Sequence, residues 1–94
     1  MIKVNEYFDG RVKSFGIESA EGRQTVGVIK PGDYEFTTDS SEVMTVVFGK
    51  ISLYYPQYNE WEEFERGSSF SVPEKSVFQI KVEQDSAYLC EYGI

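Results

Sequence analysis

The sequence predicts a single all-β domain of about eight strands, arranged as a barrel or jelly roll. Three observations support this fold class: apolar and polar residues alternate, turn signals divide the chain at short intervals, and helical patterns are almost absent. The one helix candidate, residues 59–66, lasts barely two turns and ends at Gly67. We therefore expect a strand or a turn there.

Strands are expected wherever the period of two is clear. Residues 33–37, 70–72 and 78–83 each alternate apolar with polar side chains, which is typical of half-buried strands. The turn signals follow one another at the spacing of a β-meander or barrel: Glu21-Gly22, Pro31-Gly32, Thr38–Ser41, Phe48-Gly49-Lys50, Pro56–Glu60, Arg66-Gly67 and Glu83–Ser86.

Length and composition limit the organisation of the chain. With 94 residues, 40% of them hydrophobic, it can build one modest core, so residues 1–94 are expected to form one domain. No apolar run approaches the ~18 residues of a membrane span, so no membrane partner is expected. Cys90 is the single cysteine and follows an apolar leucine, which fits a buried thiol in the reducing cytoplasm.

The charge of the chain argues against nucleic acid as a partner. Its formal net charge is −7, whereas binding to a phosphate backbone needs clustered Lys and Arg. More than half of the nine cations nevertheless fall in the first third of the chain: Lys3, Arg11, Lys13, Arg23 and Lys30. They form either a local positive pocket or a scatter of solubilising charges.

Two spacings narrow the fold further. Glu42 precedes Gly49 with six residues between them, Gly67 precedes Pro73 with five between them, and Gly32 opens the first segment. This arrangement resembles the two motifs of the cupins, which are jelly-roll barrels. The expected fold is therefore a single cupin-type barrel.

The cupin resemblance also implies where metal ligands would lie. The positions that align with the cupin histidines hold Phe36, Thr38 and Phe78, and the sequence contains no histidine. Glu42 alone remains of four ligands, whereas catalytic transition metals are held by three or more protein ligands. We therefore expect a pocket without metal and no cofactor.

Longer stretches of the chain resemble the small bacterial pyrimidine/purine nucleoside phosphorylases. The stretches that carry this resemblance are Asn5-Glu6-Tyr7-Phe8, Val12-Lys13-Ser14, Val26-Gly27-Val28, Gly32-x-Tyr34-x-Phe36, Glu42-x-Met44-Thr45-Val46, Trp61, Gly67-Ser68-x-Phe70-x-Val72-Pro73 and Tyr88-Leu89-Cys90-x-Tyr92. The chain departs from the family pattern at Phe48 and Glu74, which both lie at expected turns.

The family resemblance implies an activity that composition and spacing do not show. It implies a one-domain cupin, assembled as a homodimer, that acts as a pentosyltransferase of the glycosyltransferase class. With inorganic phosphate as co-substrate, such an enzyme splits purine and pyrimidine nucleosides into free base and pentose 1-phosphate.

The chemistry of this reaction can be compared with the residues available. Phosphorolysis of an N-glycosidic bond passes through an oxocarbenium-like sugar, so it requires a cation for phosphate, a contact for the ribose and a place for the base. Arg23 can hold phosphate through its planar fork, with Lys13 on the preceding strand as a second charge. The alternative is a surface arginine paired with Glu21.

Aromatic and carboxylate side chains are the candidates for contacts with the base and the ribose. Phe36 and Phe78 can stack on a base, although both also suit a plain core. Glu42 is the catalytic candidate: it is expected to contact ribose hydroxyls or stabilise the positive sugar, unless it is a solvated strand end. Weaker candidates for substrate binding are the hydroxyl groups of Tyr34, Thr38, Thr45 and Tyr88.

The residues alone also leave a different class of protein open. An aromatic content of 16% suits a non-catalytic, metal-free cupin that binds a small sugar or metabolite, or an interaction module with an aromatic dimer face. Phosphate-dependent release of free base from nucleosides distinguishes the enzyme from the binding module.

Overall fold

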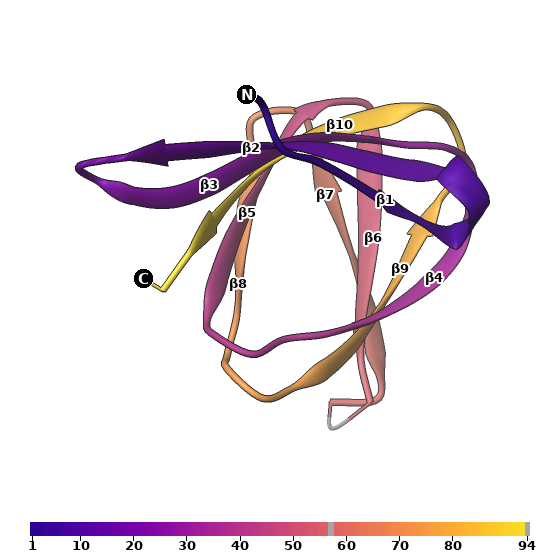
Figure 1. The fold of residues 1–94 in the computed structure, drawn as a ribbon. Helices are drawn as coiled ribbons and strands as arrows, with labels where there is room; N and C mark the ends of the chain where they lie inside the picture. Colours follow the sequence, from indigo (N-terminus) through magenta and orange to yellow (C-terminus); the bar gives the residue numbers. More distant parts are fainter. Residues whose placement is uncertain (57, 94) are drawn as a thin grey trace.

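Two antiparallel β-sheets face each other in this protein and enclose its apolar core (Figure 1). The computed structural model describes residues 1–56 and 58–93. A single turn of 3-10 helix, η1 (Phe8–Gly10), follows the first strand. The order along the six-stranded sheet is β1 (Val4–Tyr7), β2 (Val12–Ser19), β3 (Gly22–Ile29), β10 (Ser86–Tyr92), β5 (Glu42–Phe48) and β8 (Ser69–Val72). The order along the four-stranded sheet is β4 (Gly32–Thr37), β9 (Val77–Val82), β6 (Lys50–Tyr55) and β7 (Glu60–Glu65).

The all-β class and the jelly-roll-like arrangement predicted from the sequence are confirmed. Two details differ: the described residues form ten strands instead of about eight, and they make a two-sheet sandwich instead of a closed barrel. The expected strands at residues 33–37, 70–72 and 78–83 correspond to β4, β8 and β9, although β9 ends at Val82, and most of the short helix pattern forms β7. Within the described part of the chain, a helix with the length and apolarity needed to cross a membrane is absent.

The core between the sheets is formed by alternate side chains of the strands. Phe78, Ile80 and Val82 of β9 belong to the same buried cluster as Val12 of β2 and Ile29 of β3. Each of these five side chains is at most 2% exposed. Their burial stabilises the sandwich by roughly 1.5–3 kcal/mol per side chain. The alternation that predicts the strands therefore also sets the direction of their side chains.

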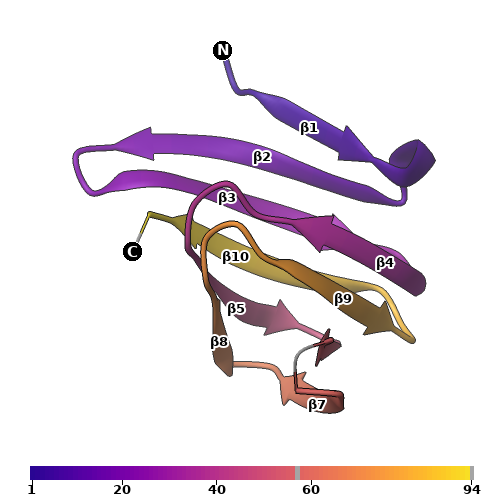
Figure 2. The ribbon, with the colours of Figure 1, turned by 90° about the horizontal axis from the view of Figure 1, so that it is seen from below.

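Strands β2 and β3 reverse the usual distribution of side chains between the two faces of a sheet. Apart from Val12 and Ile29 at one end, their inward positions hold small or polar residues, among them Ser14, Gly16, Thr25 and Gly27. Several of their outward positions are apolar yet exposed, and are occupied by Phe15, Ile17, Val26 and Val28. The hairpin of β2 and β3 also extends beyond the four-stranded sheet, as Figure 2 shows. The reversal leaves space between the sheets and an apolar surface outside them.

Candidate active site

A cavity of about 560 Å³ lies between the two sheets, a volume within the usual range for small-molecule sites. Its apolar part is lined by Ile29, Phe36, Ile51, Phe78 and Ile80. Its charged part is lined by Lys3, Glu18, Arg23, Asp39 and Glu42. Four of these five charged residues are exposed and the fifth is half-buried, so the charged part forms the mouth of the cavity.

Strand pairing explains why the cavity lies against the inner face of β2 and β3. Gly27 of β3 stands opposite both Ser14 of β2 and Tyr88 of β10. A Cβ atom at Gly27 would come within 2.5 Å of the Tyr88 ring, so the ring occupies the place where a side chain would begin. At the next inward position, Gly16 stands opposite Thr25. Small residues at these inward positions leave space for the cavity between the two sheets.

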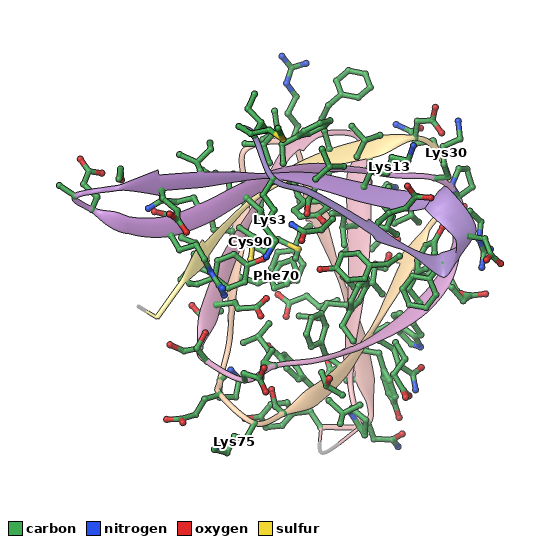
Figure 3. All side chains as sticks on the ribbon, in the orientation of Figure 1. Lys3, Lys13, Lys30, Phe70, Lys75 and Cys90 are labelled. Carbon is green, nitrogen blue, oxygen red and sulfur yellow. The ribbon has the colours of Figure 1, made fainter. Side chains whose placement is uncertain are left out.

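Two cations, Lys3 and Arg23, line the mouth of the cavity. Among the described residues, no ion pair includes Lys3 or Arg23. The Arg23 guanidinium instead lies 4.3 Å from the centre of the Tyr92 ring. Figure 3 shows Lys3 and Cys90 near each other in the centre of the view, and both line the cavity. Unpaired cations in the cavity of an acidic protein favour an anionic ligand.

Glu42 is the half-buried carboxylate of the site. Its Oε1 accepts a hydrogen bond from the Cys90 thiol at 3.4 Å. Burial raises the pKa of Glu42 above its ordinary value, although the Cys90 bond and the charge of Arg23 each lower it in part. Burial, together with the nearby Glu42 charge, raises the pKa of the Cys90 thiol to about 12. The thiol therefore stays protonated at neutral pH and can donate to the carboxylate.

Two tyrosines of β10 complete the polar wall of the cavity. Burial raises the pKa of both Tyr88 and Tyr92, so both phenols keep their protons at neutral pH. The Tyr92 hydroxyl lies 3.1 Å from the Thr25 hydroxyl, and Ser14 lowers the pKa of Tyr88 in part. These tyrosines therefore act as hydrogen-bonding groups and not as bases.

An aromatic pair forms the opposite wall. Phe36 of β4 and Phe78 of β9 are direct partners in the sheet, and their rings stack with centroids 5.7 Å apart. Phe78 is 2% exposed, whereas Phe36 is half-buried and contacts Phe8 of η1 edge-on at 5.5 Å. Phe36 therefore offers the more accessible ring to a ligand, and Phe78 supports it from the core.

The structure brings five of the predicted site residues together at the cavity: Arg23, Phe36, Glu42, Phe78 and Tyr88. Lys13 lies elsewhere, contrary to expectation. It alternates with the buried Val12 and Ser14, so its side chain lies on the outer face of β2, where it pairs with Glu6 at 3.8 Å. In Figure 3, Lys13 accordingly lies apart from Lys3 and Cys90.

Two further candidates also lie outside the cavity. Tyr34 is buried, and its hydroxyl donates to the backbone carbonyl of Lys30 at 2.6 Å. Thr45 points to the outer face of β5, where its hydroxyl lies 2.8 Å from that of Ser69. Both hydroxyls therefore connect parts of the fold, and neither meets the cavity.

Thr38 occupies a position that aligns with a cupin metal ligand, yet its side chain is also structural. It follows the end of β4, where its hydroxyl donates to the Pro73 carbonyl at 2.7 Å and accepts the Ser76 N–H at 3.0 Å. The residue is 5% exposed and links the loops that follow β4 and β8. The chain direction at this loop turns Thr38 away from the cavity.

Lys3, Cys90 and Tyr92 line the cavity but are missing from the set of site residues predicted from the sequence. The reversed pattern of β2 and β3 is the signal that indicates them. Inward positions that are small or charged identify the cavity side of β3, and the strand pairing then places β1 and β10 beside it.

Comparisons with known proteins decide the family. A family model described as pyrimidine/purine nucleoside phosphorylase matches residues 2–92. This chain belongs to the pyrimidine/purine nucleoside phosphorylase family. Curated relatives with that name from Pseudomonas entomophila and Pseudomonas syringae pv. tomato are 55% and 52% identical to it over 92 residues. These matches cover 98% of this chain and 98% and 99% of the relatives, respectively. The resemblance noted in the sequence is confirmed.

Solved structures share the same fold. A crystal structure of a Vibrio parahaemolyticus protein of unknown function has a TM-score of 0.94 and 41% identity, with 98% of each chain covered. A protein of unknown function from Acinetobacter has a TM-score of 0.91 and 32% identity, covering 98% of this chain and 90% of its own. A putative ethanolamine utilization protein from Salmonella typhimurium has a TM-score of 0.78 at 11% identity, covering 99% and 94%. That last likeness concerns the fold alone.

Proposed function

We propose that this member of the pyrimidine/purine nucleoside phosphorylase family is a broad-specificity pentosyltransferase. It splits purine and pyrimidine nucleosides with inorganic phosphate into free base and pentose 1-phosphate. The observation that carries the proposal is the cavity itself, which combines two cations, a half-buried carboxylate and an accessible aromatic ring. These are the three contacts that phosphate, ribose and base require.

The two ends of the cavity suggest how the substrates are oriented. Phosphate binds at the mouth, where Arg23 offers its planar fork and Lys3 a point charge. The base lies against Phe36 in the apolar part. The ribose then lies between them, within reach of Glu42. This orientation presents a phosphate oxygen to C1′ from the face opposite the base.

In the proposed reaction the C1′–N bond breaks while a phosphate oxygen forms a bond to C1′. The electron pair of the broken bond leaves with the base, which takes up a proton from water or from a protonated group of the site. Ionised Glu42 stabilises the positive charge that develops on the sugar, and its position in a half-buried site strengthens this effect.

The apolar end of the cavity explains why several bases can be accepted. A ring face contacts any purine or pyrimidine by stacking, and such contacts depend little on the identity of the base. With few directional contacts, the enzyme relies on the placement of phosphate and sugar.

Free base released from a panel of nucleosides, measured by HPLC with and without phosphate, tests the proposal. Release of several bases only when phosphate is present is the expected result. Release without phosphate would indicate hydrolysis instead. No release from any nucleoside, together with binding of a small sugar or metabolite, would favour the alternative of a non-catalytic, metal-free cupin.

We also propose that no metal takes part. The positions that align with the cupin ligands hold Phe36, Thr38 and Phe78, none of which is a ligand for a divalent transition metal in this setting. Base release should therefore survive EDTA. Stoichiometric metal in the active protein, measured by elemental analysis, would contradict this.

A further inference from the structure

Tyr92 contacts both charged groups of the proposed site. Its ring lies under the Arg23 guanidinium, with 4.3 Å between the guanidinium carbon and the ring centre. Its hydroxyl lies 3.1 Å from the Thr25 hydroxyl, and Tyr92 and Cys90 each affect the pKa of the other. The Cys90 thiol donates to Glu42 at 3.4 Å. Arg23, Tyr92, Cys90 and Glu42 are therefore neighbouring groups at one side of the cavity.

The register of the sheet holds these neighbouring groups in place. Cys90 stands directly opposite Thr25 of β3, and Tyr92 stands directly opposite Glu42 of β5. The hydrogen bonds cross between these two pairs, so they join three neighbouring strands near the end where Arg23 lies. The Cys90 side chain is almost completely buried, at 1% exposure, which removes competition from water.

The donor to Glu42 can be assigned from its chemistry. An ionised carboxylate only accepts, so the single hydrogen of the Cys90 thiol points to Glu42. The Thr25 and Tyr92 hydroxyls share one hydrogen bond, in which either oxygen can donate. The thiol hydrogen of Cys90 is therefore the buried donor directed at the carboxylate. This bond favours the charged form of Glu42 and fixes its direction.

We propose that Cys90 and Tyr92 are positioning residues that couple the two charged halves of the site, Cys90 by orienting Glu42 and Tyr92 by holding Arg23 over its ring. The inference rests on the roles given to Arg23 and Glu42 in the proposed function. Neither residue touches the reacting atoms: each acts through the charged group beside it.

Several charged and titratable groups face Glu42 and must be considered with it. They come from six parts of the fold and comprise Lys3 before β1, Tyr7 of β1, Glu18 of β2, Arg23 of β3, Asp39 after β4, and Tyr88, Cys90 and Tyr92 of β10. The two tyrosines of β10 and the thiol stay protonated at neutral pH, because burial raises their pKa values. The Cys90 hydrogen bond and the charge of Arg23 together oppose the effect of burial on the pKa of Glu42.

Paired substitutions separate the effect of Cys90 on Glu42 from the effect of Tyr92 on Arg23. Cys90→Ala removes the donor to Glu42, whereas Cys90→Ser keeps one. Tyr92→Phe removes the hydroxyl but keeps the ring under Arg23, whereas Tyr92→Leu removes both. Trp61→Leu is a matched control, because Trp61 lies under the cation of Lys81 at 5.1 Å outside the cavity.

The first measurement is an NMR titration of the Glu42 side-chain carboxyl, which needs no turnover. We expect the pKa of Glu42 to rise in Cys90→Ala and to stay near the parent value in Cys90→Ser. The second measurement is phosphate binding, followed by titration with inorganic phosphate. We expect Tyr92→Leu to weaken it about two- to fivefold, the range of an exposed cation–π contact, and Tyr92→Phe and Trp61→Leu to leave it unchanged.

If the parent protein releases base, the same variants can also be compared by enzyme kinetics. Cys90→Ala should lower kcat and move the acid limb of its pH profile upward with little change in the phosphate KM, and Cys90→Ser should restore both. A Glu42 pKa that is the same in Cys90→Ala and Cys90→Ser, or phosphate binding that is unaffected in Tyr92→Leu, would overturn the coupling. If the parent protein releases no base, the proposed function fails, while the two titrations still decide the coupling.

Discussion

Lys13 and Arg23 carry the same charge and lie on neighbouring strands, yet only Arg23 lines the cavity. Arg23→Lys keeps the charge but loses the planar fork, so the apparent phosphate KM should rise while the nucleoside KM changes little. Loss of a charged hydrogen bond costs roughly 1.5–3 kcal/mol, which corresponds to about a 10- to 150-fold fall in kcat/KM for phosphate. Steady-state kinetics at varied phosphate measures this.

Lys13→Met is the control for Arg23→Lys, because its side chain lies on the outer face of β2 and pairs with Glu6. Its phosphate kinetics should match those of the parent protein. Unchanged phosphate kinetics in Arg23→Lys would place the phosphate site elsewhere, and Lys3→Met would then be the next variant to measure.

Phe36 and Phe78 share the aromatic wall but differ in exposure, so their substitutions should behave differently. Phe36→Leu removes the accessible ring, and we expect the nucleoside KM to rise while the phosphate KM is spared. Phe78 is 2% exposed, so Phe78→Leu would also disturb the core and is less suited to this test. Kinetics of Phe36→Leu that match the parent for every nucleoside would show that the base binds elsewhere.

The raised pKa of Glu42 has a consequence for stability. Because burial raises its pKa in the folded protein, the native state prefers the protonated carboxyl. This contribution to stability is fully present below the ordinary pKa of 4.5 and is lost as the pH rises through the folded value. Glu42→Gln stays neutral at every pH, so we expect it to melt at a higher temperature than the parent at pH 7.

Thermal melts at pH 7 and pH 3.5 test this expectation. At pH 3.5 Glu42 is protonated in both states of the parent protein, so the difference between parent and Glu42→Gln should disappear. An equal or lower melting temperature for Glu42→Gln at pH 7 would show that Arg23 and Cys90 outweigh the burial of the charge. If Glu42→Gln is more stable but less active than the parent protein, Glu42 is retained for function at a cost in stability.

The candidate site could be predicted from the sequence only where strand parity and side-chain chemistry agree. Arg23 and Glu42 lie at inward positions and line the cavity, as expected. Lys13 lies one residue from an inward position, and this single step moves its side chain to the other face of the sheet. Thr38 lies beyond the end of β4, where strand parity no longer sets the direction of a side chain.

At the scale of the elements, β2 and β3 show how small residues create the cavity. Gly27→Ala places a methyl group within 2.5 Å of the Tyr88 ring, which must move or strain the strand. Such overpacking costs about 1–3 kcal/mol, and a domain of this size loses about 4–8 °C in melting temperature per kcal/mol. Thermal denaturation should therefore show a clear loss of stability.

Gly16→Ala is the matched control on β2. A Cβ atom there would lie 3.5 Å from the Lys3 Cβ, which is an ordinary contact, and its backbone is not in the left-handed region. We expect its melting temperature to equal or slightly exceed that of the parent, because alanine restricts the unfolded chain. If Gly27→Ala were as stable as Gly16→Ala, the close packing of Tyr88 on β3 would be disproved.

The strands themselves were predictable to different degrees. The alternating segments around Tyr34, Phe70 and Phe78 form β4, β8 and β9, because one face of each is buried. In β7 the alternation is hidden, since five of its six residues are exposed and the edge of the sheet buries only part of Phe64. Sequence patterns therefore identify strands with one buried face, including the edge strands β4 and β8, better than a strand such as β7 that is exposed on both faces.

At the scale of the whole molecule, the two faces of the six-stranded sheet differ in what they can bind. The inner face holds the cavity, whereas the outer face carries a row of apolar partners across four strands, which are Val4, Phe15, Val26 and Leu89. Three of these four side chains are exposed, by 53%, 46% and 39% for Val4, Phe15 and Val26. Ile17, Val28 and Val47 extend the same surface. An apolar surface of this kind in a small protein marks an interface.

We propose that a second copy of the chain covers this outer face, giving the symmetric homodimer that the family resemblance implies. A two-fold axis brings the same patch together from both copies, so the apolar row on one copy packs against that on the other. Lys13 and Glu6 also lie on this face and pair with each other at 3.8 Å, so this pair adds no net charge to the surface through which two acidic molecules would meet. Light scattering at micromolar concentration should therefore give the mass of a dimer.

Val26→Asp tests which face forms the dimer. A carboxylate at the centre of the outer face would be buried without a partner in the dimer, so we expect this variant to sediment as a monomer with its fold intact by circular dichroism. Val77→Asp is the control, because Val77 is also exposed, by 44%, but lies on β9 of the four-stranded sheet. It should remain a dimer. If the parent protein has the mass of a monomer, the homodimer is refuted; if Val26→Asp stays dimeric, another face forms the interface.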